Sequence, residues 1–215
     1  MKSNLRLVEP QIETEKQRVS LSRNPHGRKL DADYGRADRK YLRPAEVEQL
    51  IRAAKDGRHG QRDALMISLA YHHGLRVAEL VGLQWDAIDL KAGTIAIKRK
   101  KGGIDGVQHL APADARALRS LRSKADGSRH VFNSERGGPL TRDAFAKMFA
   151  AVGERAGLDR RLSHPHALRH AAGHALANSG RVNEYQLQSI MGHKDPRSTR
   201  VYVQGVAGLI KGLWD

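Results

Sequence analysis

Apolar residues recur at helical spacing along most of the chain. Pro44 suits the first position of a helix, and the apolar residues after it follow at i, i+3, i+4 and i+7: Val47, Leu50, Ile51 and Ala54. Residues 64–71 are almost wholly apolar and lead to Gly74, which predicts a central buried helix that ends near this glycine. The first half of the chain is therefore expected to build a helical core.

Helical patterns continue towards the C-terminus. Arg76 and Pro112 each begin a predicted helix, and Thr141 can cap another. The helix that opens at Pro165 is expected to bury four apolar residues: Leu168, Ala172, Ala175 and Leu176. A further apolar run ends at Gly192, because glycine takes positive φ without strain, and a short segment follows it.

One stretch alternates with the period of a strand. Residues 94–98 read Thr-Ile-Ala-Ile-Lys, Gly102 and Gly106 mark a long turn, and residues 108–111 return as the partner strand. Residues 130–132 predict one more short strand. The fold class predicted from these patterns is mainly α with a small antiparallel β-hairpin or sheet (α+β).

The periodicity also divides the chain. Residues 1–40 show little of it and much charge, which predicts a basic N-terminal arm that is extended or poorly ordered. The folded domain is expected over residues 41–203. Residues 204–215 predict a C-terminal apolar helix from a stripe that ends beside Trp214: Val206, Leu209, Ile210 and Leu213. Such a stripe has to be buried, either on the chain's own core or on a neighbouring subunit.

Composition points to an anionic partner. The chain has 215 residues, with 38 basic against 23 acidic side chains and a net charge of +15. A polyanion is therefore the leading expectation, and a solvated basic surface is the alternative. The absence of cysteine excludes disulfides and thiol catalysis. No apolar run reaches the roughly 20 residues that span a bilayer, and the N-terminus lacks the apolar core of a signal peptide, so we expect a cytoplasmic protein without membrane contacts.

Two arginines, two histidines and one tyrosine lie at the boundaries of predicted elements: Arg76, His166, Arg169, His193 and Tyr202. This combination suits chemistry at a phosphodiester. Attack on phosphorus adds negative charge to the equatorial oxygens, and fixed cations that grip those oxygens stabilise the transition state. Arginine suits this task because its planar fork donates two parallel hydrogen bonds and stays charged.

Each member of this set has an expected role. Arg76 and Arg169 are the predicted phosphate clamp, although a salt bridge between Arg76 and Glu79 is an alternative one turn along the helix. His166 lies three positions before Arg169, so the two should share one helical face. His166 can take a tyrosine proton, and His193 can donate to a non-bridging oxygen.

A metal site is the competing interpretation of the histidines. His166, His170 and His174 follow one another at i, i+4 and i+8. No His-Glu-x-x-His pattern and no cysteine accompany them, so we expect no metal, and His170 and His174 are interpreted as core or supporting residues. The Gly-x-x-x-x-Gly-Lys-Ser/Thr loop is also absent from the sequence, and no cofactor is expected.

Four motifs together resemble the tyrosine recombinase (phage integrase) family. They are Gly-Leu-Arg-Val-Ala-Glu-Leu at 74–80, His-Ala-Leu-Arg at 166–169, Met-Gly-His at 191–193, and Tyr202 in the position of the family's nucleophile. Each motif alone is weak, but their order makes the set specific. The resemblance covers the chain from about Tyr41 onwards. It implies a DNA breaking-rejoining catalytic domain in which Tyr202 forms a 3′-phosphotyrosyl intermediate.

The resemblance also implies a lysine general acid at the tip of the hairpin. The basic run Lys98, Arg99, Lys100 and Lys101 precedes Gly102. Lys101 fits the acid best and Lys100 is the alternative. Lys98, Arg99 and Lys100 are expected to contact DNA. A basic strand end that only touches phosphate is the plainer interpretation for Lys101 or Lys100.

The implied function is a site-specific DNA recombinase that carries out inversion, integration or excision. About 40 residues cannot encode the family's helical clamping domain, so the chain resembles the short branch that includes fimbrial-switch invertases. The expected partner is double-stranded DNA, bound as a dimer or tetramer on paired sites, with room for an accessory DNA-bending protein and with the C-terminal helix docked on the next subunit. The alternatives are a type IB topoisomerase-like swivelase and a non-catalytic DNA-binding regulator.

Overall fold

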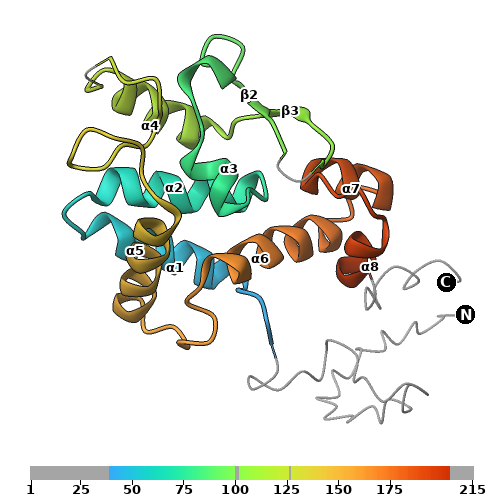
Figure 1. Cartoon of the computed structure of the whole chain (residues 1–215). Coiled ribbons are helices and arrows are strands. Elements are labelled where there is room, and N and C mark those ends of the chain that lie inside the picture. Colours follow the sequence, from blue (N-terminus) through green and yellow to red (C-terminus); the bar gives the residue numbers. More distant parts are fainter. Residues whose placement is uncertain (1–38, 100–101, 126, 204–215) are drawn as a thin grey trace, which may run out of the picture.

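The computed structural model describes residues 39–99, 102–125 and 127–203 (Figure 1). Three of the predicted features lie outside the described residues. They are the N-terminal arm except for residues 39–40, the C-terminal helix, and the two lysines Lys100 and Lys101. The described α-helices are α1 (Pro44–Lys55), α2 (Gly60–His72), α3 (Val77–Val81), α4 (Pro112–Arg122), α5 (Arg142–Arg155), α6 (Pro165–Asn178), α7 (Glu184–Met191) and α8 (Arg197–Val203), and Trp85–Ala87 forms a 3₁₀ helix. The described strands are β1 (Ile88–Asp89), β2 (Thr94–Ile97) and β3 (Gly106–His109).

Helix α2 is the central element that the apolar run predicted. It packs against α1, α4 and α6, and its residues from Asp63 to Ala70 are all buried (Figure 1). Hydrogen bonds hold α4 against α2. The Asp114 carboxylate of α4 accepts a hydrogen bond from the Ser68 hydroxyl at 2.6 Å and contacts Nδ1 of His72 at 2.6 Å. The polar end of α2 therefore ties two helices together, and the backbone turns at Gly74 towards α3.

The small sheet has the order β1-β2-β3 and is antiparallel throughout. Thr94 pairs with His109, and Ile97 pairs with Gly106. The predicted hairpin is confirmed, but β3 lies two residues earlier than expected. The turn is tighter because the Asp105 carboxylate accepts a hydrogen bond from the Arg99 backbone at 2.7 Å and so closes the base of the turn.

Two local predictions need correction. Residues 130–132 do not form a strand, because their only ladder contact is an isolated bridge between Gln84 and His130. Strand β1, which has only two residues, was not predicted. Both segments are too short to show the alternation of apolar and polar residues that marks a strand. Their conformation therefore depends on tertiary packing.

Helices α7 and α8 sit at the far end of α6 and build a second, smaller apolar cluster there (Figure 1). Its fully buried members are Leu187, Met191 and Tyr202. Helix α7 is capped at its start by Asn183, whose side chain accepts from the Gln186 backbone. It ends at Gly192 with a φ of 63°, as predicted. This end of α7 also contacts β3, so the hairpin and the C-terminal helices meet.

Candidate active site

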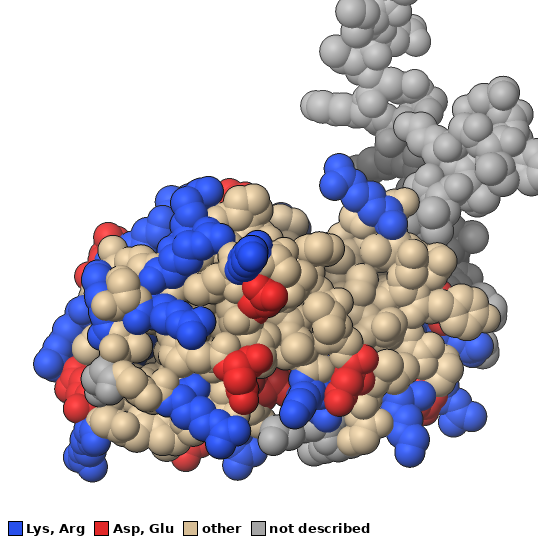
Figure 2. Space-filling view, turned by 90° about the horizontal axis from the view of Figure 1, so that it is seen from above, with Lys and Arg blue, Asp and Glu red and all other residues tan. Residues whose placement is uncertain are grey.

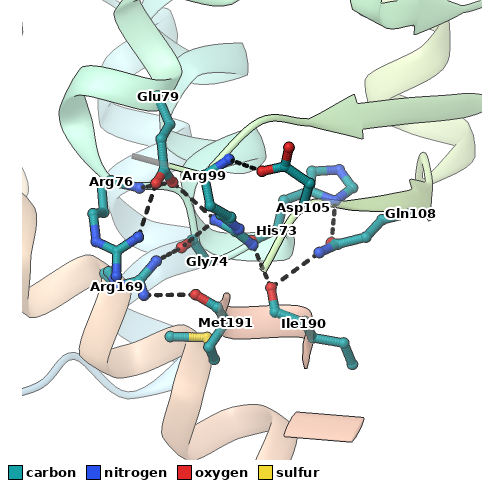
Figure 3. A network of polar contacts seen from close by, with 10 residues as sticks. All are labelled: His73, Gly74, Arg76, Glu79, Arg99, Asp105, Gln108, Arg169, Ile190 and Met191. Carbon is teal, nitrogen blue, oxygen red and sulfur yellow. Dashed lines mark hydrogen bonds and ion pairs between the residues drawn. The ribbon is translucent and has the colours of Figure 1, made fainter. Parts of the chain in front are cut away.

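Arg76 lies at the N-terminal boundary of α3, where Glu79 holds it. Nη1 of Arg76 donates to Oε1 of Glu79 at 2.9 Å, and the Arg76 backbone N–H donates to Oε2 at 2.9 Å (Figure 3). The alternative salt bridge between Arg76 and Glu79 is thus present. The Arg76 side chain is nevertheless 31% exposed, so this ion pair does not bury it completely.

Arg169 projects from α6 into the interior and is 4% exposed. Its two terminal nitrogens donate to backbone carbonyls, one to Gly74 and one to Met191, the latter at 2.7 Å (Figure 3). Burial, with the nearby positive charges of Arg76 and Arg99, lowers the pKa of Arg169 to about 10. The side chain therefore stays cationic at neutral pH and links the end of α2 to the end of α7.

Arg99 departs from its expected role as a DNA contact. Its side chain is 1% exposed and donates to Oε2 of Glu79 at 2.8 Å. It also donates to the carbonyls of His73 at 3.0 Å, Gly74 at 3.3 Å and Ile190 (Figure 3). The alternation that buries Ile95 and Ile97 in β2 continues past the strand and turns Arg99 towards the core. The carbonyls at the C-terminal ends of α2 and α7 accept hydrogen bonds from its guanidinium. Lys98, one residue earlier, is exposed.

Glu79 has a larger part in the site than its sequence motif indicates. Its buried carboxylate bridges Arg76 and Arg99, one oxygen facing each guanidinium. Burial raises the pKa of Glu79, but hydrogen bonds from the two arginines outweigh it and hold the pKa below its usual range. The available signal was the Arg-x-x-Glu spacing, which puts both residues on one helical face.

Tyr202 lies on α8 and is 4% exposed. Its hydroxyl is 3.1 Å from Nδ1 of His170. The ring of His193 stacks at a centroid distance of 6.1 Å, and the ring of His174 meets Tyr202 edge-on at 5.2 Å. Burial raises the pKa of the Tyr202 hydroxyl, and the positive charges of Arg169 and Arg76 oppose that rise. Tyr202 therefore lies within electrostatic reach of both arginines.

The two predicted histidines differ in exposure. His193 follows Gly192 and is 7% exposed, and its Nδ1 is 3.0 Å from the Thr199 hydroxyl. Burial, followed by the charges of Arg169 and Arg76, lowers the pKa of His193 to about 4. His166 is exposed on the first turn of α6, and burial with the charge of Arg169 lowers its pKa.

The structure thus brings five of the predicted residues close together, from the boundary before α3, the first turns of α6, the position after Gly192, and α8: Arg76, His166, Arg169, His193 and Tyr202. Within the described ranges, no group of three His, Cys, Asp or Glu side chains could hold a metal ion. The same ranges contain no helix long and apolar enough to cross a membrane.

The surface seen from above carries many basic side chains. Lys and Arg gather on the left of this view, the side of the molecule that holds α4 (Figure 2). Helix α4 contributes three exposed arginines to the surface: Arg116, Arg119 and Arg122. A surface of this kind attracts a polyanion and does not by itself select a sequence.

Comparisons with known proteins agree on one family. The phage integrase family matches residues 40–207 of this chain. Type 1 fimbriae regulatory protein FimB of Escherichia coli (strain K12) is 36% identical over 182 residues, which is 82% of this chain and 90% of FimB. Tyrosine recombinase XerC of Xylella fastidiosa (strain M23) is 33% identical over 163 residues, 73% of this chain and 53% of XerC.

A solved structure agrees as well. The crystal structure of XerA recombinase is similar with a TM-score of 0.67 and 26% identity, over 81% of this chain and 63% of XerA. The chain belongs to the phage integrase family and is a tyrosine site-specific recombinase. The expected fold of the catalytic domain is confirmed, and the relatives do not favour the swivelase or the non-catalytic regulator.

Proposed function

We propose that the protein cleaves a strand of duplex DNA by attack of the Tyr202 hydroxyl on a phosphodiester and rejoins it by the reverse step. The 3′-phosphotyrosyl link keeps the energy of the broken bond, so rejoining needs no ATP. The observation that supports this most is the position of Tyr202 near two arginines. Arg169 donates to the carbonyl of Met191, which packs in the same buried cluster as Tyr202. The positive charges of Arg169 and Arg76 both act to lower the pKa of the Tyr202 hydroxyl.

Arg76 and Arg169 would hold the non-bridging oxygens of the phosphate. Glu79 fixes Arg76 while leaving part of its side chain exposed, and the carbonyls of Gly74 and Met191 fix Arg169. Each arginine is therefore oriented before DNA arrives, which keeps reorganisation small when charge develops in the transition state.

His193 would donate to a non-bridging oxygen, with Thr199 setting the orientation of its ring. His166 lies beside Arg169 at the start of α6 and faces solvent, so it can exchange a proton with the reacting groups. The leaving 5′ oxygen would take a proton from Lys101, or from Lys100 as the alternative. Lys98, which is exposed and directly follows β2, would add a phosphate contact.

The biological reaction would be inversion, integration or excision between paired sites, carried out by a dimer or tetramer on double-stranded DNA. The net charge of +15 supports tight, salt-dependent binding to the DNA backbone. The C-terminal helix would dock on the next subunit, and the reaction would tolerate an accessory DNA-bending protein. We place this activity in the cytoplasm, where the DNA is.

A covalent-trapping experiment tests the proposal. The protein is incubated with a pool of randomised duplexes that each carry a nick, because the nick releases the cleaved fragment and traps the adduct. Adducts are resolved under denaturing conditions and the attached ends are sequenced. Tyr202→Phe should bind the pool normally and form no adduct, since it lacks only the nucleophilic oxygen.

Tyr185→Phe is the matched control, because Tyr185 is 82% exposed and lies on α7. It should form the adduct as the wild type does. Adduct formation by Tyr202→Phe, or its loss when a chelator is added to the wild type, would contradict the proposed mechanism.

A further inference from the structure

We propose that His170 is a further catalytic residue, whose Nδ1 holds the Tyr202 hydroxyl and accepts its proton as the oxygen attacks phosphorus. This inference rests on the proposed function, since it requires Tyr202 to be the nucleophile. The sequence alone suggested only a core or supporting role for His170, and the general-base role was expected for His166.

The contact between the two side chains is direct. Nδ1 of His170 and the hydroxyl oxygen of Tyr202 are 3.1 Å apart, and the ring centroids are 5.8 Å apart. Tyr202 reaches this place because α8 lies close against α6. A Cβ added at Gly173 would fall 2.6 Å from the Tyr202 ring, so only glycine admits the ring at that point of α6.

The ring of Tyr202 is enclosed on its other sides as well. His174 meets it edge-on and His193 stacks on it, so the hydroxyl has little freedom to leave Nδ1 of His170. The packing of α8 against α6 brings the two side chains together. This is the arrangement that a proton acceptor needs, because donor and acceptor must already be within hydrogen-bond reach.

His166 is less well placed for this step. It is exposed, its ring meets that of His170 edge-on at 4.4 Å, and no hydrogen bond joins it to Tyr202 in the described part of the chain. His166 lies on the outer side of His170, beside Arg169, which leaves its nitrogens available for a phosphate oxygen or for solvent.

His170 is neutral before the reaction. Burial, together with the positive charge that His166, His174 and Arg169 bring, lowers its pKa to about 4. A neutral imidazole with its proton on Nε2 presents the Nδ1 lone pair to the Tyr202 hydroxyl. The tyrosine proton moves only as the bond to phosphorus forms, because that bond turns a weakly acidic phenol into a strongly acidic one.

The step balances as follows. The bond between Oη of Tyr202 and phosphorus forms, and the bond between phosphorus and the 5′ oxygen breaks. The Oη proton passes to Nδ1 of His170, and the 5′ oxygen takes a proton from the lysine ammonium proposed above. Rejoining reverses each transfer, so His170 returns its proton to Tyr202.

The test compares His170→Asn and His170→Ala with the wild type in single-turnover cleavage of a nicked duplex recovered from the trapped pool. The Oδ1 atom of asparagine can occupy the place of Nδ1 and accept the same hydrogen bond, but it cannot take a proton. His59→Asn is the matched control, because His59 lies at the start of α2 and pairs with Glu135.

Both His170 variants should bind DNA as the wild type does and lose about a hundredfold or more in cleavage rate, the usual contribution of a general base. Added imidazole should restore part of the His170→Ala rate, and His59→Asn should cleave normally. Cleavage by His170→Asn within a few-fold of the wild type would show that the hydrogen bond alone matters and would overturn the proposal. Should the wild type itself form no adduct, the proposed function fails first and this inference fails with it.

Discussion

At the scale of residues, the site balances buried cations with carbonyls and one carboxylate. Arg99 and Arg169 donate to carbonyls at two helix C-termini, at residues 73–74 directly after α2 and at residues 190–191 in the last turn of α7 (Figure 3). Each helix C-terminus carries roughly half a negative charge. With Glu79 these two ends offset about two positive charges, so three arginines leave about one in excess, which suits a phosphodiester.

One prediction at this scale concerns Thr199, which is fully buried and lies 3.0 Å from Nδ1 of His193. Thr199→Val keeps the shape but removes the hydroxyl that orients the imidazole. We expect cleavage to slow by about tenfold, which corresponds to about 1.4 kcal/mol in the barrier, with DNA binding unchanged.

Single-turnover adduct formation measures this effect, and Thr199→Ser is its control because serine keeps the hydroxyl. Serine should cleave nearly as fast as threonine. A valine variant with the wild-type rate would mean that the Thr199 contact does not orient His193 for the reaction.

At the scale of elements, the sequence predicted the helix boundaries that depend on the conformational preferences of neighbouring residues. The helix start at Pro44, the Thr141 cap and the left-handed end at Gly192 all follow from propensities of single residues, and the structure confirms each. The burial of Arg99 could not be predicted in this way. It depends on the end of α7 packing against the hairpin, which brings together residues about 90 positions apart.

The candidate site also combines features that the sequence predicts with features that depend on tertiary packing. The sequence motifs predicted five residues that lie close together in the structure. They could be recognised because each motif has a characteristic set of residue types and the motifs follow one another in a fixed order. The sequence did not predict the contact between His170 and Tyr202. It depends on how α8 packs against α6, which the spacing of residues along the chain does not determine.

A prediction at this scale uses the close approach of α6 and α8. Considered for α6 alone, Gly173→Ala should stabilise the helix, because alanine in a helix interior is more stable than glycine by about 1 kcal/mol. The added methyl would collide with the Tyr202 ring and push α8 away. We therefore expect thermal stability to change little while adduct formation is lost.

Circular dichroism gives the melting temperature of this variant and the trapping experiment gives its activity. Gly138→Ala is the control, because a Cβ there meets nothing within 4 Å and the substitution should leave adduct formation intact. Normal cleavage by Gly173→Ala would show that α8 need not rest on α6 for reaction.

At the scale of the whole molecule, the histidines around the site link stability to pH. The pKa values of His170 and His193 are lowered to about 4, chiefly by burial, whereas an unfolded chain has histidines near about 6.5. Between these values the unfolded state binds more protons than the folded state. The free energy of unfolding therefore decreases as the pH falls through this window.

The carboxylates with lowered pKa values act at lower pH. Glu46, Glu79 and Asp159 are all held below their usual range, so each destabilises the fold only as the pH falls below about 4.5. A comparison between pH 7 and pH 5 thus isolates the histidines.

We expect the melting temperature of the wild type to fall by about 3 °C or more from pH 7 to pH 5, since 1 kcal/mol shifts a domain of this size by roughly 2–4 °C. Both histidines keep partial contact with solvent or polar neighbours, which moderates the effect. The double variant His170→Asn, His193→Asn should show a shallower decrease, because it has lost the two groups that must gain protons on unfolding. Thermal unfolding followed by circular dichroism at pH 7, 6 and 5 measures both proteins. If the wild type melted at the same temperature across this range, or if the double variant lost stability as steeply, the buried histidines would not be the neutral groups that the site requires.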